Sequence, residues 1–172
     1  AQQISQGIQA PPVGLDTAEW GFDHGTWSVL KPMFPKADIP VVQLSMDYSR
    51  PPAEHYALGQ QLKGLRERGV LVVGSGNIVH NLRLARWNAG DEAYPWALEF
   101  DGWVKQTLRA GDHDALVHQA QALESGKRSI PTPEHWLPLL YIVGTTHAGE
   151  QPEFLYEGME LASISMRSVR FG

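Results

Sequence analysis

The stretch VLVVGSGNIVH, residues 70–80, decides how this chain can fold. Residues 70–73 form a short apolar run of Val and Leu, the pattern typical of a strand buried on both faces. Glycines end the run, and His80 follows shortly afterwards. In open α/β sheets, ligands bind beyond the carboxyl ends of the strands. His80 is therefore predicted to lie where such a fold carries its site.

The sequence before this stretch predicts a second strand and a connecting helix. Residues 41–45, VVQLS, form another buried strand, and a helix with leucines on one face covers residues 51–68. Gly69 stands where a helix-terminating glycine belongs, directly before the strand at 70–73. A strand, a helix and a strand in close succession form a βαβ unit. We predict an α/β fold with a mostly parallel or mixed central sheet flanked by helices, in three α/β/α layers.

The remaining chain predicts further helices and one late strand within a single domain, residues 1–172. An amphipathic helix is expected over 94–109 and a buried helix after Pro133, with Pro138 in its first turn. Alternating side chains over 160–170 indicate a half-buried strand, and we expect it at an antiparallel edge. Short helices are expected over 27–34 and 112–122, and a polar loop over 124–129.

Composition restricts the class of partner. The 172 residues are 42% hydrophobic and 19% charged, which is typical of a folded domain. With 14 Lys and Arg against 19 Asp and Glu, the net charge is −5, so we expect no nucleic acid or membrane partner and favour a small molecule. The absence of cysteine excludes disulfides and thiolate chemistry and fits a cytoplasmic protein. No pattern indicates an oligomeric state.

The first residues, Ala1-Gln2-Gln3, lack an initiator Met and read as the end of a helix. We therefore expect the natural protein to carry sequence before Ala1.

Three of the seven histidines are candidates for chemistry. His24, His80 and His135 each lie at a junction between predicted elements, beside residues that restrict the backbone. Neutral imidazole binds Fe, Zn and Cu and titrates near neutrality. Taken one at a time, a hydrogen-bonded structural role is the favoured interpretation of each, and no pair has the i, i+4 spacing of a helix-borne metal site. The other histidines, His55, His113, His118 and His147, are expected at the surface.

Other chemistries have weaker support. Residues 74–77, GSGN, resemble a phosphate-binding turn but lack the full glycine fingerprint and the P-loop Lys. Ser75 lacks the G-x-S-x-G frame of a hydrolase nucleophile. The six tryptophans are expected mostly in the core, with a minority lining an aromatic pocket.

Together, three longer motifs resemble the 4,5-DOPA extradiol dioxygenases, members of the class III, LigB-type ring-opening superfamily. They are WGFDHGTW at 20–27, GSGNIVHNL at 74–82 and PTPEHWLPL at 131–139. The similarity continues in order along nearly the whole chain. It implies that this chain corresponds to the C-terminal portion of such an enzyme.

The resemblance also implies roles for individual residues. His80 is expected at the metal and as an acid/base group, His135 as a metal ligand, and His24 as a group facing substrate or oxygen. Asp23 and Asn81 are expected to orient their neighbours. A 2-His-1-carboxylate site would instead favour Glu134 over His135.

The resemblance implies Fe(II) as cofactor, with Zn(II) able to occupy the site in a purified sample, and a catechol and O2 as partners. Two N-terminal histidine motifs of the family, HGSP-like and SAHW-like, are missing here, so metal should bind weakly. Two alternatives stay open: a zinc-dependent hydrolase that activates water with the same imidazoles, and a non-catalytic metal-binding remnant of the fold.

Overall fold

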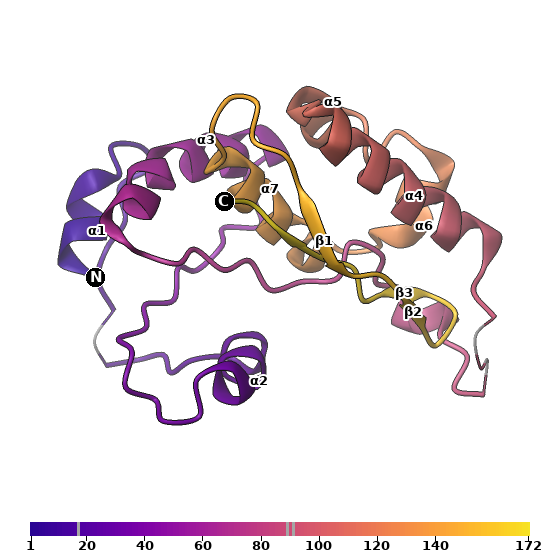
Figure 1. Cartoon of the computed structure of the whole chain (residues 1–172), viewed down its shortest axis with the longest axis horizontal. Coiled ribbons are helices and arrows are strands. Elements are labelled where there is room, and N and C mark those ends of the chain that lie inside the picture. The colour runs from indigo at the N-terminus through magenta and orange to yellow at the C-terminus, as the bar shows by residue number, and fades with distance from the viewer. Residues whose placement is uncertain (17, 89, 91) are drawn as a thin grey trace.

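A computed structural model describes residues 1–16, 18–88, 90 and 92–172 (Figure 1). In the described residues the helices come first along the chain, and the short strands follow near its end. The elements are α1 Gln2–Gly7, α2 His24–Met33, α3 Pro52–Leu62, η1 Lys63–Arg68, η2 Leu82–Leu84, α4 Pro95–Ala110, α5 His113–His118, α6 Glu124–Ser129, η3 Pro133–His135, α7 Leu137–Gly144, β1 Glu153–Tyr156, β2 Met159–Glu160, β3 Ile164–Ser165 and β4 Ser168–Arg170.

The centre of the molecule is the packing of α3 against α7, which lie side by side in Figure 1. Two glycines allow their backbones to touch. A Cβ on Gly59 would lie 2.4 Å from the Tyr141 carbonyl oxygen, and one on Gly144 would lie 2.6 Å from the Tyr56 carbonyl oxygen. No side chain fits in either space, so this contact depends on both glycines.

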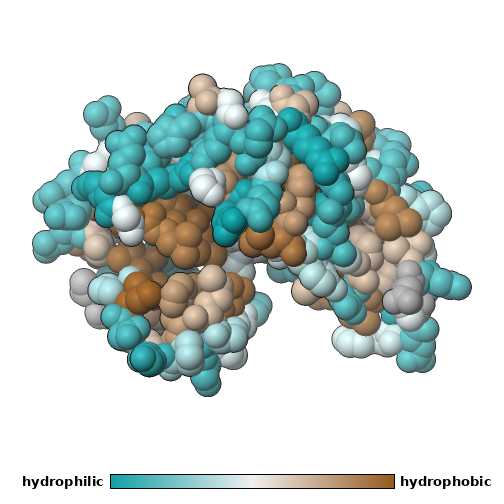
Figure 2. All heavy atoms as spheres, in the orientation of Figure 1, coloured by the Kyte–Doolittle hydropathy of each residue, from teal (hydrophilic) through white to brown (hydrophobic). Residues whose placement is uncertain are grey.

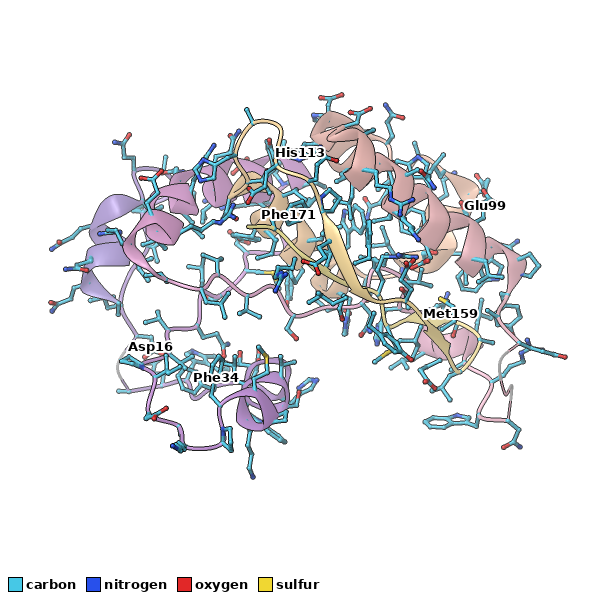
Figure 3. The ribbon with its side chains drawn as sticks, viewed as in Figure 1. Asp16, Phe34, Glu99, His113, Met159 and Phe171 are labelled. Atoms are coloured by element: carbon cyan, nitrogen blue, oxygen red, sulfur yellow. The ribbon has the colours of Figure 1, made fainter. Side chains whose placement is uncertain are left out.

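The second half of the core lies under α4. Phe100 and Val104 on its inner face are fully buried, and Trp136, at the start of α7, packs against Phe100 with ring centroids 5.7 Å apart. Figure 3 shows side chains crowded between α4, α7 and β1, with Glu99 on the far side of α4. The amphipathic helix predicted over 94–109 is confirmed, with its bounds moved by one residue.

Two small antiparallel sheets close the chain. β1 pairs with β4, and β2 pairs with β3, the sheet marked by Met159 in Figure 3. The predicted late strand is therefore present as two short strands, β3 and β4, in antiparallel pairs. An isolated bridge between His80 and Ile164 joins this region to the loop that carries His80.

The predicted central sheet is not confirmed. Residues 41–45 and 70–73 run extended, but neither forms a strand in the part of the chain that the structure describes. Leu44 and Val72 are half-buried, but other side chains in these segments are exposed: Val42 by 48% and Leu71 by 65%. A strand needs a hydrogen-bonded neighbour, and the observed sheets supply none to these two segments. The three-layer arrangement accordingly stays a prediction.

Several local predictions hold and others are wrong. The helix from Pro52 ends in η1, and Gly69 terminates it at φ 73° as predicted. Pro138 occupies the first turn of α7. The loop expected over 124–129 is instead the short helix α6, which packs on α4. Three tryptophans expected mostly in the core are exposed: Trp20, Trp27 and Trp87.

His55, expected at the surface, is only 2% exposed. Its Nδ1 lies 2.9 Å from the Tyr141 hydroxyl, so it joins α3 to α7 as a core residue. None of the described helices is both long and apolar enough to cross a lipid bilayer.

Candidate metal centre

The loop at 74–80 carries His80 and lies directly on η3 and the start of α7. A Cβ on Gly76 would lie 2.5 Å from the His135 carbonyl oxygen, and one on Gly74 would lie 2.8 Å from the Pro138 carbonyl oxygen. The two glycines therefore serve close backbone approach. This contact accounts for the GSGN motif without a phosphate ligand.

His80 is fixed through its backbone. Its amide N–H donates to the Ser129 carbonyl at 2.9 Å, and it forms the bridge to Ile164. Its ring stacks on the ring of His135, with centroids 3.5 Å apart and an interplanar angle of 18°. The two histidines that the sequence places 55 positions apart (135 minus 80) therefore lie in direct contact.

His135 and Glu134 both reach this point from η3. The Asn77 amide N–H donates to His135 Nδ1 at 3.3 Å, and the Thr132 hydroxyl donates to Glu134 Oε1 at 2.6 Å. His80, Glu134 and His135 each offer one ligand atom, and these three atoms lie within 4.8 Å of one another. Among the described residues, these three side chains form the one cluster of acidic or imidazole groups that is close enough to hold a metal ion.

The electrostatics suit a cation. Burial lowers the pKa of His80, and Glu134 opposes this shift. Burial, then His80, lowers the pKa of His135. Burial alone would raise the pKa of Glu134, but the Thr132 hydrogen bond and the nearby imidazoles bring it below its usual value. At neutral pH the site thus holds two neutral imidazoles and a carboxylate, a donor set that fits a divalent metal and resembles the 2-His-1-carboxylate sites of Fe(II) enzymes.

His24 lies beside this cluster and is not one of its three members. It is the first residue of α2, where Asp23 caps the helix by accepting from the Thr26 amide at 2.8 Å. A Cβ on the neighbouring Gly25 would lie 3.5 Å from Ser75 Oγ, so α2 begins against the glycine-rich loop. His24 is exposed, and its charge contributes to the lowered pKa of His135.

Residues 1–172 match the family described as "Catalytic LigB subunit of aromatic ring-opening dioxygenase". The chain belongs to this family. The resemblance to LigB-type extradiol dioxygenases that the motifs suggested is thereby confirmed.

Curated relatives extend the comparison of this LigB chain. It is 45% identical over 175 residues to "4,5-DOPA dioxygenase extradiol" of Escherichia coli K12, covering 100% of this chain and 64% of that protein. It is 37% identical to the protein of the same name from Portulaca grandiflora, covering 89% of this chain and 56% of that protein. The chain thus spans less than two thirds of the length of these relatives.

A crystal structure of an uncharacterized protein from Escherichia coli K12 is also similar to this LigB chain. The TM-score is 0.92 at 45% identity, covering 100% of this chain and 71% of the other.

Some residues that stabilise the site of this LigB chain were not predicted from the sequence to have a role there. Asn81 was expected to orient a neighbour; its side chain donates to the Arg128 carbonyl at 2.7 Å, and the carbonyl of the next residue, Ser129, accepts from the His80 amide. Asn77 and Ser165, which received no role from the sequence, connect the His80 loop to β3. The only sequence signal for Asn77 was its position after Gly74-Ser75-Gly76, and Ser165 carried none.

Proposed function

We propose that this chain contributes the metal-binding site of an extradiol ring-cleaving dioxygenase that acts on a catechol-type aromatic of the DOPA kind. The observation that carries the proposal is the cluster of His80, Glu134 and His135 donor atoms within 4.8 Å. Membership of a ring-opening dioxygenase family and the names of the relatives support the reaction and the substrate class.

In this proposal His80 and His135 hold the metal, and Glu134 supplies the nearby negative charge. Fe(II) bound there would supply the oxygen chemistry and lower the pKa of the catechol hydroxyl, whereas Zn(II) would fill the site without redox activity. The stacking of the two rings and the hydrogen bond from Asn77 limit how far His135 can turn.

The proton of the catechol needs a separate acceptor. A neutral imidazole has one nitrogen with a free lone pair, so a His80 that binds the metal through it has no lone pair left for a proton. His24 is the imidazole beside the cluster that stays exposed. We therefore propose His24 for the proton transfer when His80 binds the metal; the acid/base role that the resemblance implies for His80 would require His135 and Glu134 to hold the metal without it.

The test uses the protein expressed from its full gene and loaded anaerobically with Fe(II). On addition of DOPA and oxygen, we expect oxygen uptake and a yellow ring-opened product. Zinc-loaded protein is the matched control and should take up no oxygen. His80→Ala should abolish turnover, and His24→Ala should lower kcat while metal stays bound. Absence of oxygen uptake with every catechol tried would refute the proposed reaction.

A further inference from the structure

The helix α2 carries His24 but has little burial of its own. None of its residues is buried in the described part of the chain, so hydrophobic contact holds the helix only weakly. His24, which we propose for the proton transfer, is its first residue. The place of His24 beside the metal cluster therefore depends on contacts at the start of the helix.

The side chain of Gln43 completes the hydrogen bonding at that start. Its Oε1 accepts from the Asp23 amide at 3.0 Å and from the Thr26 hydroxyl at 2.9 Å. Its Nε2 donates to Asp23 Oδ2 at 3.3 Å, while Asp23 Oδ1 accepts from the Thr26 amide at 2.8 Å. In a capping box, the side chain of the third helical residue accepts from the N-cap amide. Here Gln43, 20 positions away, accepts that bond from Asp23.

Gln43 is itself attached to the core of the molecule. It lies on the extended segment 41–45, and the next residue, Leu44, packs against the buried cluster that includes Leu58. Met46, one residue beyond the segment, packs against that cluster and also against the core under α4. Gln43 therefore joins the start of α2 to a segment that two apolar side chains fix in place.

The backbone of His24 is held on both sides. Before it, Asp23 is bonded to Gln43. After it, Gly25 lies against the glycine-rich loop of the metal site, where an added Cβ would be 3.5 Å from Ser75 Oγ. The contact with Ser75 places the start of α2 at the metal site. The bonds to Gln43 restrict how this first turn can rotate or move away.

We propose that Gln43 is a positioning residue for His24: its carboxamide fixes the first turn of α2 and so holds the imidazole toward a substrate at the metal. Gln43 is not a member of the metal cluster, so its loss should leave the metal affinity unchanged. A misplacement of about 1 Å in a reacting group can cost about 100-fold in rate. The inference rests on the proposed function and adds a residue that acts through His24.

The kinetic test uses the protein expressed from its full gene and loaded with Fe(II). Gln43→Met keeps the length of the side chain but removes its N–H donor and its carbonyl acceptor. We expect kcat with DOPA to fall about 10–100-fold, while KM and the Kd for Co(II) stay nearly unchanged. In a His24→Ala background the same substitution should cause no further loss, because Gln43 acts through His24. Gln61→Met is the matched control, since Gln61 bonds to the Ala10 carbonyl instead, and it should leave kcat unchanged.

A second measurement does not depend on turnover. Co(II) at the cluster broadens the NMR signals of nearby protons, and this effect falls steeply with distance from the metal. The His24 ring signal, identified by its absence in His24→Ala, should be broadened in the wild type. In Gln43→Met this broadening should weaken, because the ring is no longer held near the metal.

The outcomes separate the inference from the proposed reaction. Unchanged broadening in Gln43→Met, or an additive loss of kcat in the His24→Ala background, overturns the inference. Loss of the folded state in both Gln43→Met and Gln43→Ala also overturns it, because Gln43 would then be required for folding. Wild-type protein that binds no Co(II) overturns the metal site and this inference together. If it binds Co(II) but cleaves no catechol, only the reaction is refuted, and the NMR comparison still decides the role of Gln43.

Discussion

His135 meets two different constraints at the scale of the single residue. Its ring lies against His80, and its Nδ1 accepts from the Asn77 amide. An Nδ1 that accepts a hydrogen bond places the proton of the neutral ring on Nε2. A metal at His135 must therefore either replace the Asn77 N–H at Nδ1 or displace the proton from Nε2. Glu134 faces no such competition, because the Thr132 hydroxyl occupies one of its two carboxylate oxygens.

The choice between His135 and Glu134 as the stronger ligand can be measured. His135→Ala removes a metal-binding nitrogen. We expect the Co(II) affinity to fall by more than the factor of about 10–100 that is typical when a residue hydrogen-bonded to a ligand is lost. Glu134→Gln keeps an oxygen donor and removes only charge, so we expect a loss of about tenfold, or about 1.4 kcal/mol. Isothermal titration of both variants checks this. A larger loss for Glu134→Gln would make the carboxylate the principal ligand.

At the scale of elements, the contact between α3 and α7 sets the position of α7 and hence of η3 before it. The contact relies on Gly59 and Gly144, whose missing side chains let the two backbones touch. His55 and Tyr141 add a buried hydrogen bond across the same contact.

Gly144→Ala should destabilise the protein by about 1–3 kcal/mol, because its Cβ would lie 2.6 Å from the Tyr56 carbonyl oxygen. Gly102→Ala is the matched control. Gly102 lies inside α4 with open space around it, so alanine there should stabilise by roughly 0.5–1 kcal/mol. Urea unfolding of the two variants gives the comparison. Equal effects would show that α3 and α7 can move apart without cost.

The elements also show which features a sequence can predict. The helix α4 follows from the spacing of apolar side chains along its sequence, and the helix end at Gly69 follows from the backbone preference of glycine. Both features could therefore be predicted from the sequence. The strands predicted at 41–45 and 70–73 needed hydrogen-bonded partner strands. The local pattern of apolar residues carries no information on whether such a partner lies alongside. The burial of His55 depends on Tyr141, 86 positions away, which no local pattern reports.

The residues of the site also fall into those that the sequence could predict and those that it could not. The motifs indicated His80 and His135, and the structure brings them together with Glu134. The contact between Asn77 and Ser165 spans 88 positions, and neither residue belongs to a chemical pattern. Residues that position a site through the backbone therefore needed the structure.

At the scale of the whole molecule, the segment that carries α2 contacts the glycine-rich loop at its start, and a hollow lined by hydrophobic residues separates it from α1 and α3 (Figures 1 and 2). Val42, Leu71 and Val73 are at least 46% exposed on the extended segments. Apolar extended chain of this kind is prone to pair with other strands. Stability in the described body rests instead on helix packing and on a few buried or half-buried ion pairs.

Arg66 makes the ion pair that ties the end of the chain to the body. It donates to Glu150 Oε2 at 2.7 Å, to the Thr145 carbonyl at 2.9 Å and to the Phe171 carbonyl at 3.1 Å. The side chains of Arg66 and Glu150 are 18% and 14% exposed. The hydrogen bonds from Arg66 lower the pKa of Glu150 to about 2. Phe171, labelled in Figure 3, lies beside the body at this point.

This pair predicts how stability changes with pH. The folded-state pKa of Glu150, about 2, lies below its ordinary value of 4.5, so the unfolded chain binds the extra proton first. The stabilisation is complete above about pH 4.5 and is lost as pH falls toward 2. Glu150→Gln should cost about 2 kcal/mol at pH 7, the typical worth of a hydrogen bond to a charged group, which is about 4–8 °C in Tm for a chain of this size.

The same substitution should also flatten the fall in Tm between pH 5 and pH 2, because the titrating group is gone. Glu124→Gln, which removes an exposed partner of Lys127, is the control and should leave the Tm at pH 7 unchanged. Differential scanning calorimetry across this pH range measures both effects. A Glu150→Gln protein whose Tm falls as steeply with acid as the wild type would place the acid-sensitive group elsewhere, and the connection through Arg66 would then contribute little at neutral pH.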